Sequence, residues 1–526
     1  MKKSDRQSMR RRGALIQKLA LWLVVLLAWC SIATAQSWTP VTTQFQVGIA
    51  LQLTDGTILI QQFDTPNWWI LTPNNEASYP KGKFTPAASF PATEHYAPLY
   101  FASAVLKDGR AIVAGGEFNY GTKPTGSDTT KAAIFDPTVL PNGKWTVVPH
   151  PKGWTTIGDA QSVVLPTGTF MLANCCALPP QAALLNESTL KWTVLTSTKG
   201  FKGKTDGNDE EGWTLLPDGK VLTVDTYWPA SFYYNPNGEN SEIYDPSTGT
   251  WTSAGSTVQQ LWDSRSSCGD KTSNETGTAI LRPDGTVFVT GANSCPGSAG
   301  HTAIYNSLTG VWTAGPDIPG GNDMADAPAA LLPNGDVLID TNPGYGNNPS
   351  TFYEFTGSGY LPSIPQPTGL NPSNTEGARL LVTAQGTVLL THLRSNNIWF
   401  YNPPGTYKPE WQPHICPGCY PAIAYIGDTY TVQGTQFNGL SQGAAFGDDG
   451  QSATNYPLVL ITNNATGHKH FARTHSFSTM AVATGNELVS CKFDVLPGTE
   501  GGDSTMVVIA NGIPSEPVGI IVRQKP

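Results

Sequence analysis

The stretch "TLLPDGKVLTV" (214–224) decides the fold, because near copies of it return along the chain. Both "AILRPDGTVFVTG" (279–291) and "ALLPNGDVLID" (330–340) again join two apolar runs through a turn that contains glycine. This design is typical of a β-hairpin. The turn occurs seven times at spacings of 50 to 66 residues, and its glycines are Gly56, Gly109, Gly168, Gly219, Gly285, Gly335 and Gly386. A period of about 50 residues is typical of kelch-type propeller blades.

A second pattern follows many of these hairpins and consists of a strand, a turn and a tryptophan. It is clearest in "SEIYDPSTGTWTSAG" (241–255) and "TAIYNSLTGVWTAG" (302–315). The seventh repeat lacks its last strand, and "SWTPV" (37–41) near the N-terminus resembles the missing piece. We therefore predict an all-β fold with a seven-bladed kelch-type β-propeller over residues 37–406, in which strand 37–41 closes the last blade. Closure of this kind removes exposed sheet edges.

The blade repeat ends before residue 407. Residues 407–526 show alternating strands such as "NYPLVLITNN" (455–464) without the turn series, which predicts a compact β-sandwich. The composition agrees with an all-β chain, because 54 glycines and 42 prolines accompany only 13% charged residues.

The first 35 residues have the organisation of a signal peptide. A basic start and an apolar run precede the small residues "ATA" (33–35), so we expect cleavage after Ala35. A retained anchor helix is the alternative, although the apolar run is short for a membrane span. Cleavage predicts a secreted, periplasmic or cell-surface protein without membrane attachment. The net charge of −9 argues against a nucleic-acid partner. We expect a monomer.

Export would place the cysteines in an oxidising compartment, which favours disulfides. The predicted pairs are Cys268–Cys295 and Cys416–Cys419. The motif "CPGC" (416–419) could instead supply half of a zinc site. The adjacent Cys175 and Cys176 either form a vicinal disulfide or pair elsewhere, and Cys491 remains as a buried thiol.

The seven turns, together with "NYPLVLITNN" and "VVIANGIPSEP" (507–517), resemble the galactose oxidase and glyoxal oxidase family. The resemblance covers almost all of residues 37–526. It implies a signal peptide, a seven-bladed kelch propeller and an immunoglobulin-like (early-set) sandwich. It also implies the oxidation of carbohydrates or alcohols at a copper-radical site.

The residues that this copper site needs are not present at the expected positions. The family uses a tyrosine crosslinked to a cysteine, an axial Tyr-His pair and a histidine from a sandwich loop. Here Glu376 and Gly377 stand at the positions of the pair, and the loop at 446–456 contains no histidine. The crosslinking cysteine is expected just before the second turn, and "HYAPLYFASAVLKDG" (95–109) contains none. Copper prefers imidazole ligands, so we expect copper to be improbable and leave open whether the protein is an enzyme.

Acidic residues occur where the copper ligands would be expected. Nine or ten positions before a turn glycine, the inner strand of a blade begins at one mouth of the central channel. The acids at or next to these positions are Asp159, Asp209, Glu210, Glu211, Glu275, Asp326 and Glu376. Converging carboxylates repel one another unless protons or a cation neutralise them. A divalent metal such as Ca²⁺ suits oxygen ligands, and the candidate ligands are Glu210, Glu275, Asp326 and Glu376. Alternatively, each acid binds backbone amides and only fixes the blade geometry.

An aromatic loop at 225–240 is expected on the same face. Its Tyr227 and Trp228 could stack on sugar rings, or they could pack against a neighbouring loop. Three classes of function remain open. The first is a protein that binds a glycan or other polar small ligand at an acidic mouth, with or without Ca²⁺. The second is an enzyme, either a divergent oxidase or a hydrolase with paired carboxylates from Asp159, Glu210 and Glu275. The third is a non-catalytic surface scaffold.

Overall fold

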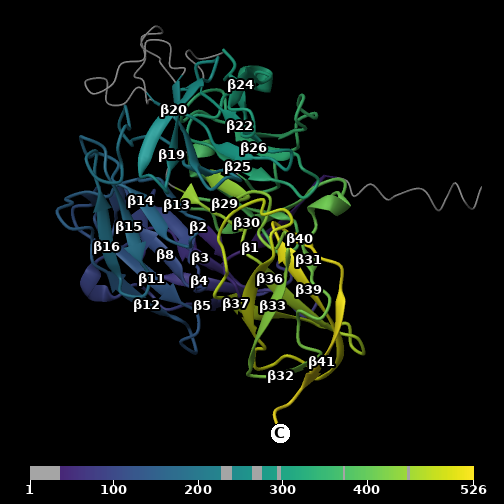
Figure 1. Ribbon diagram of the computed structural model, residues 1–526. Coiled ribbons are helices and arrows are strands. Elements are labelled where there is room, and N and C mark those ends of the chain that lie inside the picture. The colour runs from purple at the N-terminus through teal and green to yellow at the C-terminus, as the bar shows by residue number, and fades with distance from the viewer. Residues whose placement is uncertain (1–35, 227–239, 263–274, 293–297, 371–373, 447–449) are drawn as a thin grey trace, which may run out of the picture.

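The computed structural model describes residues 36–226, 240–262, 275–292, 298–370, 374–446 and 450–526 (Figure 1). Within these ranges the chain is all-β, with many small sheets and a few single-turn 3₁₀ helices but no α-helix. The described part of the chain therefore contains no helix long and apolar enough to cross a membrane. The predicted signal peptide, Tyr227, Trp228 and the predicted Cys268–Cys295 pair lie outside the described residues.

All seven expected hairpins are present in the described residues, and each belongs to a different sheet. The hairpin strands are β2 (Val47–Gln52) and β3 (Ile58–Gln62), β7 (Ala102–Val105) and β8 (Ala111–Ala114), β13 (Ser162–Val164) and β14 (Phe170–Ala173), β17 (Thr214–Leu215) and β18 (Val221–Val224), β21 (Ala279–Leu281) and β22 (Thr286–Thr290), β25 (Pro328–Leu331) and β26 (Val337–Thr341), and β28 (Ala378–Val382) and β29 (Val388–His392). We call the first strand of each hairpin its inner or first strand. On one side of β28, contacts connect β28 with β2, β2 with β7, and β7 with β13. On the other side, contacts connect β28 with β25, β25 with β21, and β21 with β17. The first strands therefore surround a common axis.

The outer strands complete these sheets. They are β4 (Trp68–Thr72) and β5 (Lys83–Pro86), β11 (Ala132–Asp136) and β12 (Lys144–Val148), β15 (Ala182–Asn186) and β16 (Lys191–Leu195), β19 (Asn240–Asp245) and β20 (Thr250–Ser256), β23 (Thr302–Asn306) and β24 (Val311–Ala314), β27 (Thr351–Phe355), and β30 (Asn397–Asn402) with β1 (Ser37–Thr42). The N-terminal β1 pairs antiparallel with β30 and is the outermost strand of the sheet that contains β28. A small sheet of β6 (Pro98–Leu99), β9 (Phe118–Asn119) and β10 (Gly126–Ser127) is inserted between these elements.

Outer-strand tryptophans join neighbouring sheets. The Nε1 of Trp145 donates to the carbonyl of Ala88 at 2.9 Å, and that of Trp312 donates to the carbonyl of Ala254 at 3.1 Å. In both cases the acceptor lies in or just after the outer strand of the preceding sheet. This contact gives a structural reason for these two tryptophans, since a buried indole N–H needs an acceptor. Trp251 in β20 makes no such hydrogen bond.

The C-terminal part of the chain forms a separate, larger sheet system (Figure 1). Its strands are β31 (His414–Ile415), β32 (Ile423–Tyr425), β33 (Thr429–Thr435), β36 (Leu458–Asn463), β37 (Lys469–His475), β38 (Val489–Asp494), β39 (Gly502–Ala510), β40 (Ile513–Pro514) and β41 (Val518–Arg523). Apolar residues of β33, β36, β38 and β39 are buried in its core, together with the free thiol of Cys491.

One segment of this C-terminal part enters the axis between the first strands. Its strands β34 (Ala444–Phe446) and β35 (Gly450–Gln451) extend the sheet of β25, with Phe446 opposite Pro328. Just before β34, Gln442 Oε1 accepts from the backbone N–H of Leu215 at 2.8 Å. The carbonyl of Gln451 accepts from Ser103 Oγ at 2.8 Å. Residues 438–446 and 450–456, which we call the axial segment, thus contact inner strands from several sheets.

The first hairpin also packs on the C-terminal sheets. Gly56 has φ = +79°, and a Cβ at this position would lie 2.1 Å from Cγ of Phe471. Nearby, the backbone N–H of Thr474 donates to the carbonyl of Thr54 at 3.0 Å. The turn glycine therefore has two roles here, because it adopts a left-handed conformation and leaves room for an aromatic ring.

We expect Gly56→Ala to destabilise the protein by about 2–4 kcal/mol. This loss combines the cost of a left-handed backbone conformation at alanine with the cost of overpacking against Phe471. Gly285→Ala is the matched control, since Gly285 occupies the same turn position with φ = +80° and its nearest neighbour would lie 3.6 Å from the new Cβ. The control should lose only about 1–2 kcal/mol. Denaturant unfolding of both variants measures the difference, and equal losses would contradict a packing role for Gly56.

Candidate functional site

Three first strands begin with the same unusual backbone conformation. Tyr100, Glu210 and Asp326 each stand nine positions before a turn glycine, and their φ values are +51°, +61° and +49°. A left-handed conformation costs a residue other than glycine roughly 1–2 kcal/mol. Its recurrence at one register places three polar side chains at the same end of the inner strands.

The Glu210 and Glu275 carboxyls form the centre of this region. Their side chains are hydrogen-bonded to each other, and burial raises the pKa of Glu210 well above its usual range. The charges of Glu275, Asp209 and Asp159 raise this pKa further, in that order. Glu275 is buried, with 8% of its surface exposed. Two carboxyls can share a hydrogen bond only when one of them carries a proton.

Two tyrosines connect the remaining acids. The hydroxyl of Tyr100 donates to Glu376 Oε1 at 2.7 Å, and Asn374 Nδ2 donates to Glu376 Oε2 at 3.2 Å. Burial raises the pKa of Tyr345 well above normal, and four carboxylates raise it further: Asp326, Glu275, Glu376 and Glu210. Both hydroxyls therefore stay protonated and remain hydrogen-bond donors at physiological pH.

A buried arginine lies beneath the Tyr100–Glu376 contact. The guanidinium of Arg379 lies 3.2 Å from the ring centre of Phe446 in the axial segment and 5.4 Å from that of Tyr100. Its Nη1 donates to the carbonyls of Glu376 and Ala378 at 2.8 and 2.7 Å. Because Arg379 is 4% exposed, it supplies positive charge under the acids while it holds the axial segment in place.

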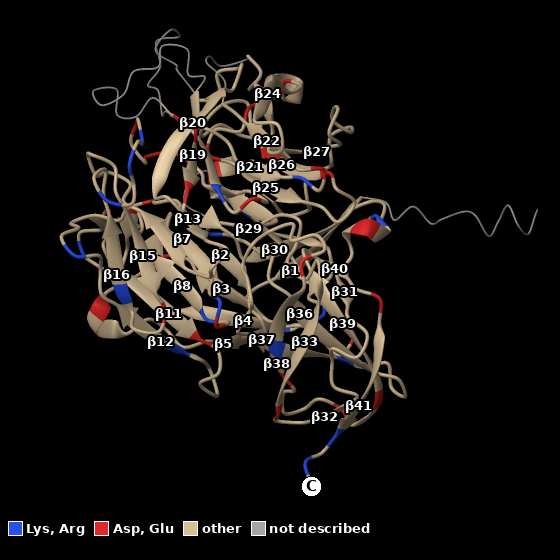
Figure 2. Ribbon diagram, in the orientation of Figure 1, with Lys and Arg blue, Asp and Glu red and all other residues tan. Residues whose placement is uncertain are grey.

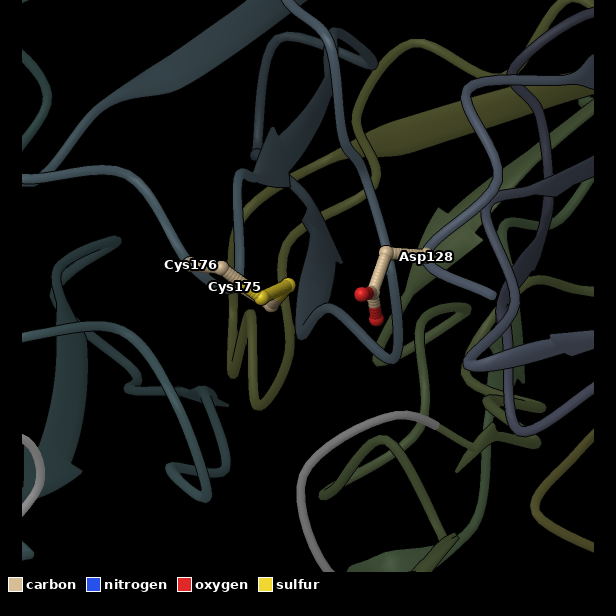
Figure 3. Close-up of side chains that lie close together, drawn as sticks. All are labelled: Asp128, Cys175 and Cys176. Atoms are coloured by element: carbon tan, nitrogen blue, oxygen red, sulfur yellow. A yellow bond between two sulfur atoms is a disulfide. The ribbon is translucent and has the colours of Figure 1, made fainter. Parts of the chain in front are cut away.

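A second group of acids continues from the Glu210–Glu275 pair toward two adjacent cysteines. A carboxylate oxygen of Asp159, one of Asp209 and the sulfur of Cys175 all lie within 4.8 Å of one another. Burial and then the charge of Asp128 raise the pKa of Asp209 to about 7. Figure 3 shows the Asp128 carboxylate beside Cys175 and Cys176, whose sulfur atoms lie 1.98 Å apart.

We call the group of acids linked by these interactions the acidic mouth. The structure brings together six of the candidate residues, namely Asp159, Asp209, Glu210, Glu275, Asp326 and Glu376. Tyr227 and Trp228 cannot be placed, because they lie outside the described residues. Away from the mouth, Cys416 and Cys419 are a close pair with sulfur atoms 2.15 Å apart.

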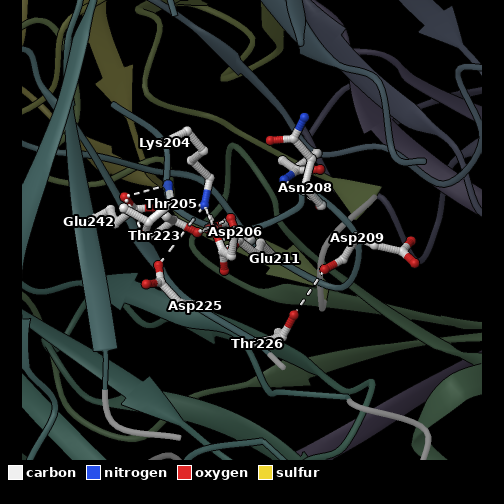
Figure 4. A network of polar contacts seen from close by, with 12 residues as sticks. Lys204, Thr205, Asp206, Asn208, Asp209, Glu211, Thr223, Asp225, Thr226 and Glu242 are labelled. Atoms are coloured by element: carbon white, nitrogen blue, oxygen red, sulfur yellow. Dashed lines mark hydrogen bonds and ion pairs between the residues drawn. The ribbon is translucent and has the colours of Figure 1, made fainter. Parts of the chain in front are cut away.

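Glu211 does not join the mouth and belongs to a buried ionic cluster around Lys204 (Figure 4). Lys204 Nζ lies 3.0 Å from Glu211 Oε1 and 2.7 Å from Glu242 Oε2, contacts Asp206 Oδ1, and lies 4.0 Å from Asp225. Burial would lower the pKa of Lys204, but the surrounding carboxylates, led by Asp206, raise it well above normal. Burial also raises the pKa values of Glu211 and Asp225 well above their usual range. The placement of Glu211 favours a structural role for this acid.

Replacement of Lys204 by methionine should leave a group of fully buried carboxyls without their cation. We expect a loss of about 3–5 kcal/mol in the free energy of unfolding at pH 7. The loss should shrink in acid, where the carboxyls become neutral. Lys220→Met is the control, because its 2.7 Å pair with Asp218 is exposed and contributes no more than about 1 kcal/mol. Equal stability of the two variants at pH 7 would refute the stabilising role of Lys204.

Sequence reasoning missed several residues of the mouth. Tyr100 stands at the same register as the acids, so the count back from Gly109 would have found it if tyrosine had been considered. Arg379 follows Glu376 by three residues and lies in the inner strand β28. Tyr345 had no signal in the sequence, since its loop reaches the mouth only through the fold.

The residues present do not fit a copper site. Each group of three or more converging histidine, cysteine and acidic side chains found in the described residues lacks histidine. His392 lies beside Gly377, but its Nδ1 and Nε2 face the carbonyls of Leu393 and Asn374 at 3.1 and 3.4 Å. Oxygen donors of this kind suit a hard cation such as Ca²⁺ better than copper.

The comparisons agree with the fold and do not assign an activity. No family model matches the sequence, and no curated protein matches it. Among solved structures, the chain is similar to a fungal alcohol oxidase of the AA5 family determined in complex with copper. The TM-score is 0.51 and the identity 13%, over 93% of this chain and all of the other. The resemblance to the galactose oxidase family is thus confirmed at the level of the fold, together with the all-β architecture.

The shared proton at the mouth predicts a dependence of stability on pH. Because the folded-state pKa of Glu210 is raised, the folded protein holds a proton that the unfolded chain releases near pH 4.5. Stability should fall as the pH rises above 4.5, by up to about 1.4 kcal/mol per pH unit, until Glu210 ionises in the folded state. Glu210→Gln should remove this slope and unfold at higher denaturant concentration than wild type at pH 8. The exposed Glu487→Gln serves as control. A slope unchanged in Glu210→Gln would disprove the assignment of the proton.

Proposed function

We propose that this protein, once exported, binds a polar ligand of the carbohydrate class at the acidic mouth, with Ca²⁺ or a similar divalent cation as part of the site. The observation that carries the proposal is the hydrogen-bonded Glu210–Glu275 pair. The nearby charges of Asp209 and Asp159 raise the pKa of Glu210 further. Carboxylates this close together repel one another, and a bound cation removes that repulsion.

The donor chemistry supports a hard divalent cation. The mouth offers carboxylate oxygens and tyrosine hydroxyls, and Ca²⁺ takes six to eight oxygen ligands. Candidate ligands are Glu210, Glu275, Asp326 and Glu376, which all act on the pKa of Tyr345. Arrival of the cation would expel the proton shared by Glu210 and Glu275, because ligands must be deprotonated.

The polar surroundings support a hydroxyl-rich ligand. Carboxylates accept hydrogen bonds from sugar hydroxyls, and the Tyr100 and Tyr345 hydroxyls stay protonated and can donate. Asp159, Asp209, Glu210 and Glu376 are each partly accessible, so a ligand can reach them. A site of this kind needs convergent polar groups rather than a redox cofactor.

Calcium titration of the chelator-treated mature protein tests the proposal. We expect the thermal midpoint to rise with CaCl₂, equivalent to about 2.7 kcal/mol at a concentration 100-fold above Kd, and protons to be released on binding. Glu275→Gln should weaken binding by about tenfold or more, whereas the exposed Glu487→Gln should bind as wild type does. A glycan panel in the presence of Ca²⁺ then identifies the ligand. If neither Ca²⁺ nor a glycan binds and Glu275→Gln changes only stability, the scaffold alternative is correct.

The second candidate is a divergent oxidase, which the likeness to the copper-bound alcohol oxidase favours through its fold. Against it stands the lack of a converging histidine group in the described residues. Copper analysis of the purified protein and an assay of peroxide release from alcohols distinguish this candidate from the first. One equivalent of copper with peroxide release would establish the oxidase and overturn the binding protein.

A further inference from the structure

Cys175 and Cys176 form the wall of the acidic mouth on the side of Asp159 and Asp209. Asn174 separates them from β14, and the backbone N–H of Cys175 donates to the carbonyl of Ile157 at 3.1 Å. The Cys175 sulfur packs on Gly158, where a Cβ would lie 2.3 Å from it. This close fit holds Cys175 against the protein, and the glycine makes the fit possible.

The two sulfurs differ in their surroundings. Cys175 is 2% exposed, whereas Cys176 is exposed to solvent. Carboxylate oxygens of Asp128, Asp159 and Asp209 all lie within 4.8 Å of the Cys175 sulfur, and the three acids come from different loops. Cys176 is therefore accessible from solvent, whereas the buried Cys175 sulfur lies beside all three acids. The Asp128 carboxylate lies within 4.8 Å of both sulfurs.

We propose that Cys175 and Cys176 form a redox-active disulfide that reacts with external thiols at Cys176, with Cys175 as the leaving sulfur. The preferred reaction partner is a thiol that also carries a positive charge. This activity goes beyond the proposed ligand binding and does not depend on Ca²⁺ or on a glycan.

The exchange proceeds in two balanced steps. A thiolate attacks the Cys176 sulfur, a mixed disulfide forms there, the bond between the two cysteines breaks, and its electron pair goes to the Cys175 sulfur. The Cys175 sulfur leaves as a thiolate and takes up a proton from the solvent. A second thiol then attacks the mixed disulfide. The external thiols leave as an oxidised disulfide, and both cysteines are left as thiols.

The charge of the surroundings decides which thiols react. Three acids beside the disulfide repel an anionic thiolate and attract a cationic one. This effect weakens with salt, because exposed charges are screened over about 10 Å at 0.1 M ionic strength. The preference for a cationic thiol comes from the charge of the three acids. Exposure of Cys176 alone would make it reactive toward any thiol and would not produce this preference.

The Cys416–Cys419 pair of the same molecule is the internal control. Its two sulfurs are both partly exposed and approach the Pro417 carbonyl at 3.8 and 4.0 Å. Neither cysteine belongs to a converging acidic group in the described residues. Differences between the two pairs therefore report on the acids and on the unequal exposure at Cys175 and Cys176.

The test treats the mature protein at low ionic strength and pH 8 with cysteamine or with mercaptoacetate, quenches with acid, alkylates free thiols and maps the peptides by mass. The measured quantity is the rate of reaction with cysteamine divided by the rate with mercaptoacetate. We expect this ratio to be about tenfold higher at Cys175–Cys176 than at Cys416–Cys419. In 1 M NaCl the two ratios should become equal. The trapped mixed disulfide should be on Cys176, with the alkyl group on Cys175. Asp128→Asn should reduce the preference for the cationic thiol while leaving the control pair unchanged.

Three results would overturn the proposal. These are free thiols at both positions in the purified oxidised protein, an adduct on Cys175 rather than Cys176, and the same charge preference at both pairs. The wild-type comparison of the two thiols does not require any variant to fold. Because Ca²⁺ is left out of the test, its outcome is separate from that of the ligand-binding proposal.

Discussion

The contacts among the first strands of the hairpins are the constraint on which the rest of the structure depends. These strands are short and almost wholly buried, and each packs against the first strand of a neighbouring sheet. Their starts therefore meet at one end of a common axis, and residues at one register in separate repeats become neighbours. The axial segment occupies the space between them and pairs with β25. The mouth is thus built by two parts of the chain, and Arg379 contacts both through Tyr100 and Phe446.

Crowded acids are stabilised in two different ways in neighbouring parts of this protein. Around Lys204 the carboxyls are fully buried and gather on an ammonium group, which neutralises part of their charge. At the mouth several of the acids are partly accessible, and the Glu210 and Glu275 side chains are hydrogen-bonded to each other instead. The first arrangement has its cation, Lys204, within the chain. The second keeps protons that a cation can displace, which is why the mouth and not the Lys204 cluster is the better candidate site.

The side chains of the mouth differ from those of a copper site although the fold is similar. The chain shares its architecture with a copper alcohol oxidase at 13% identity, yet acids, tyrosines and an arginine surround the end of its axis. A propeller places side chains at that end whatever their chemistry. Function must therefore be argued from the side chains, because one fold supports many activities.

The sequence by itself determined the hairpins, their repeat and the strand that pairs with the end of the series, because turn glycines and apolar alternation are local signals. It also indicated that acids begin several inner strands. Only the tertiary structure decided how Asp209, Glu210 and Glu211, three consecutive acids, divide between two clusters. The left-handed backbone at Glu210 lies between these two neighbours. The roles of Tyr345, Arg379 and Lys204 likewise depend on contacts distant in the chain, which local patterns do not encode.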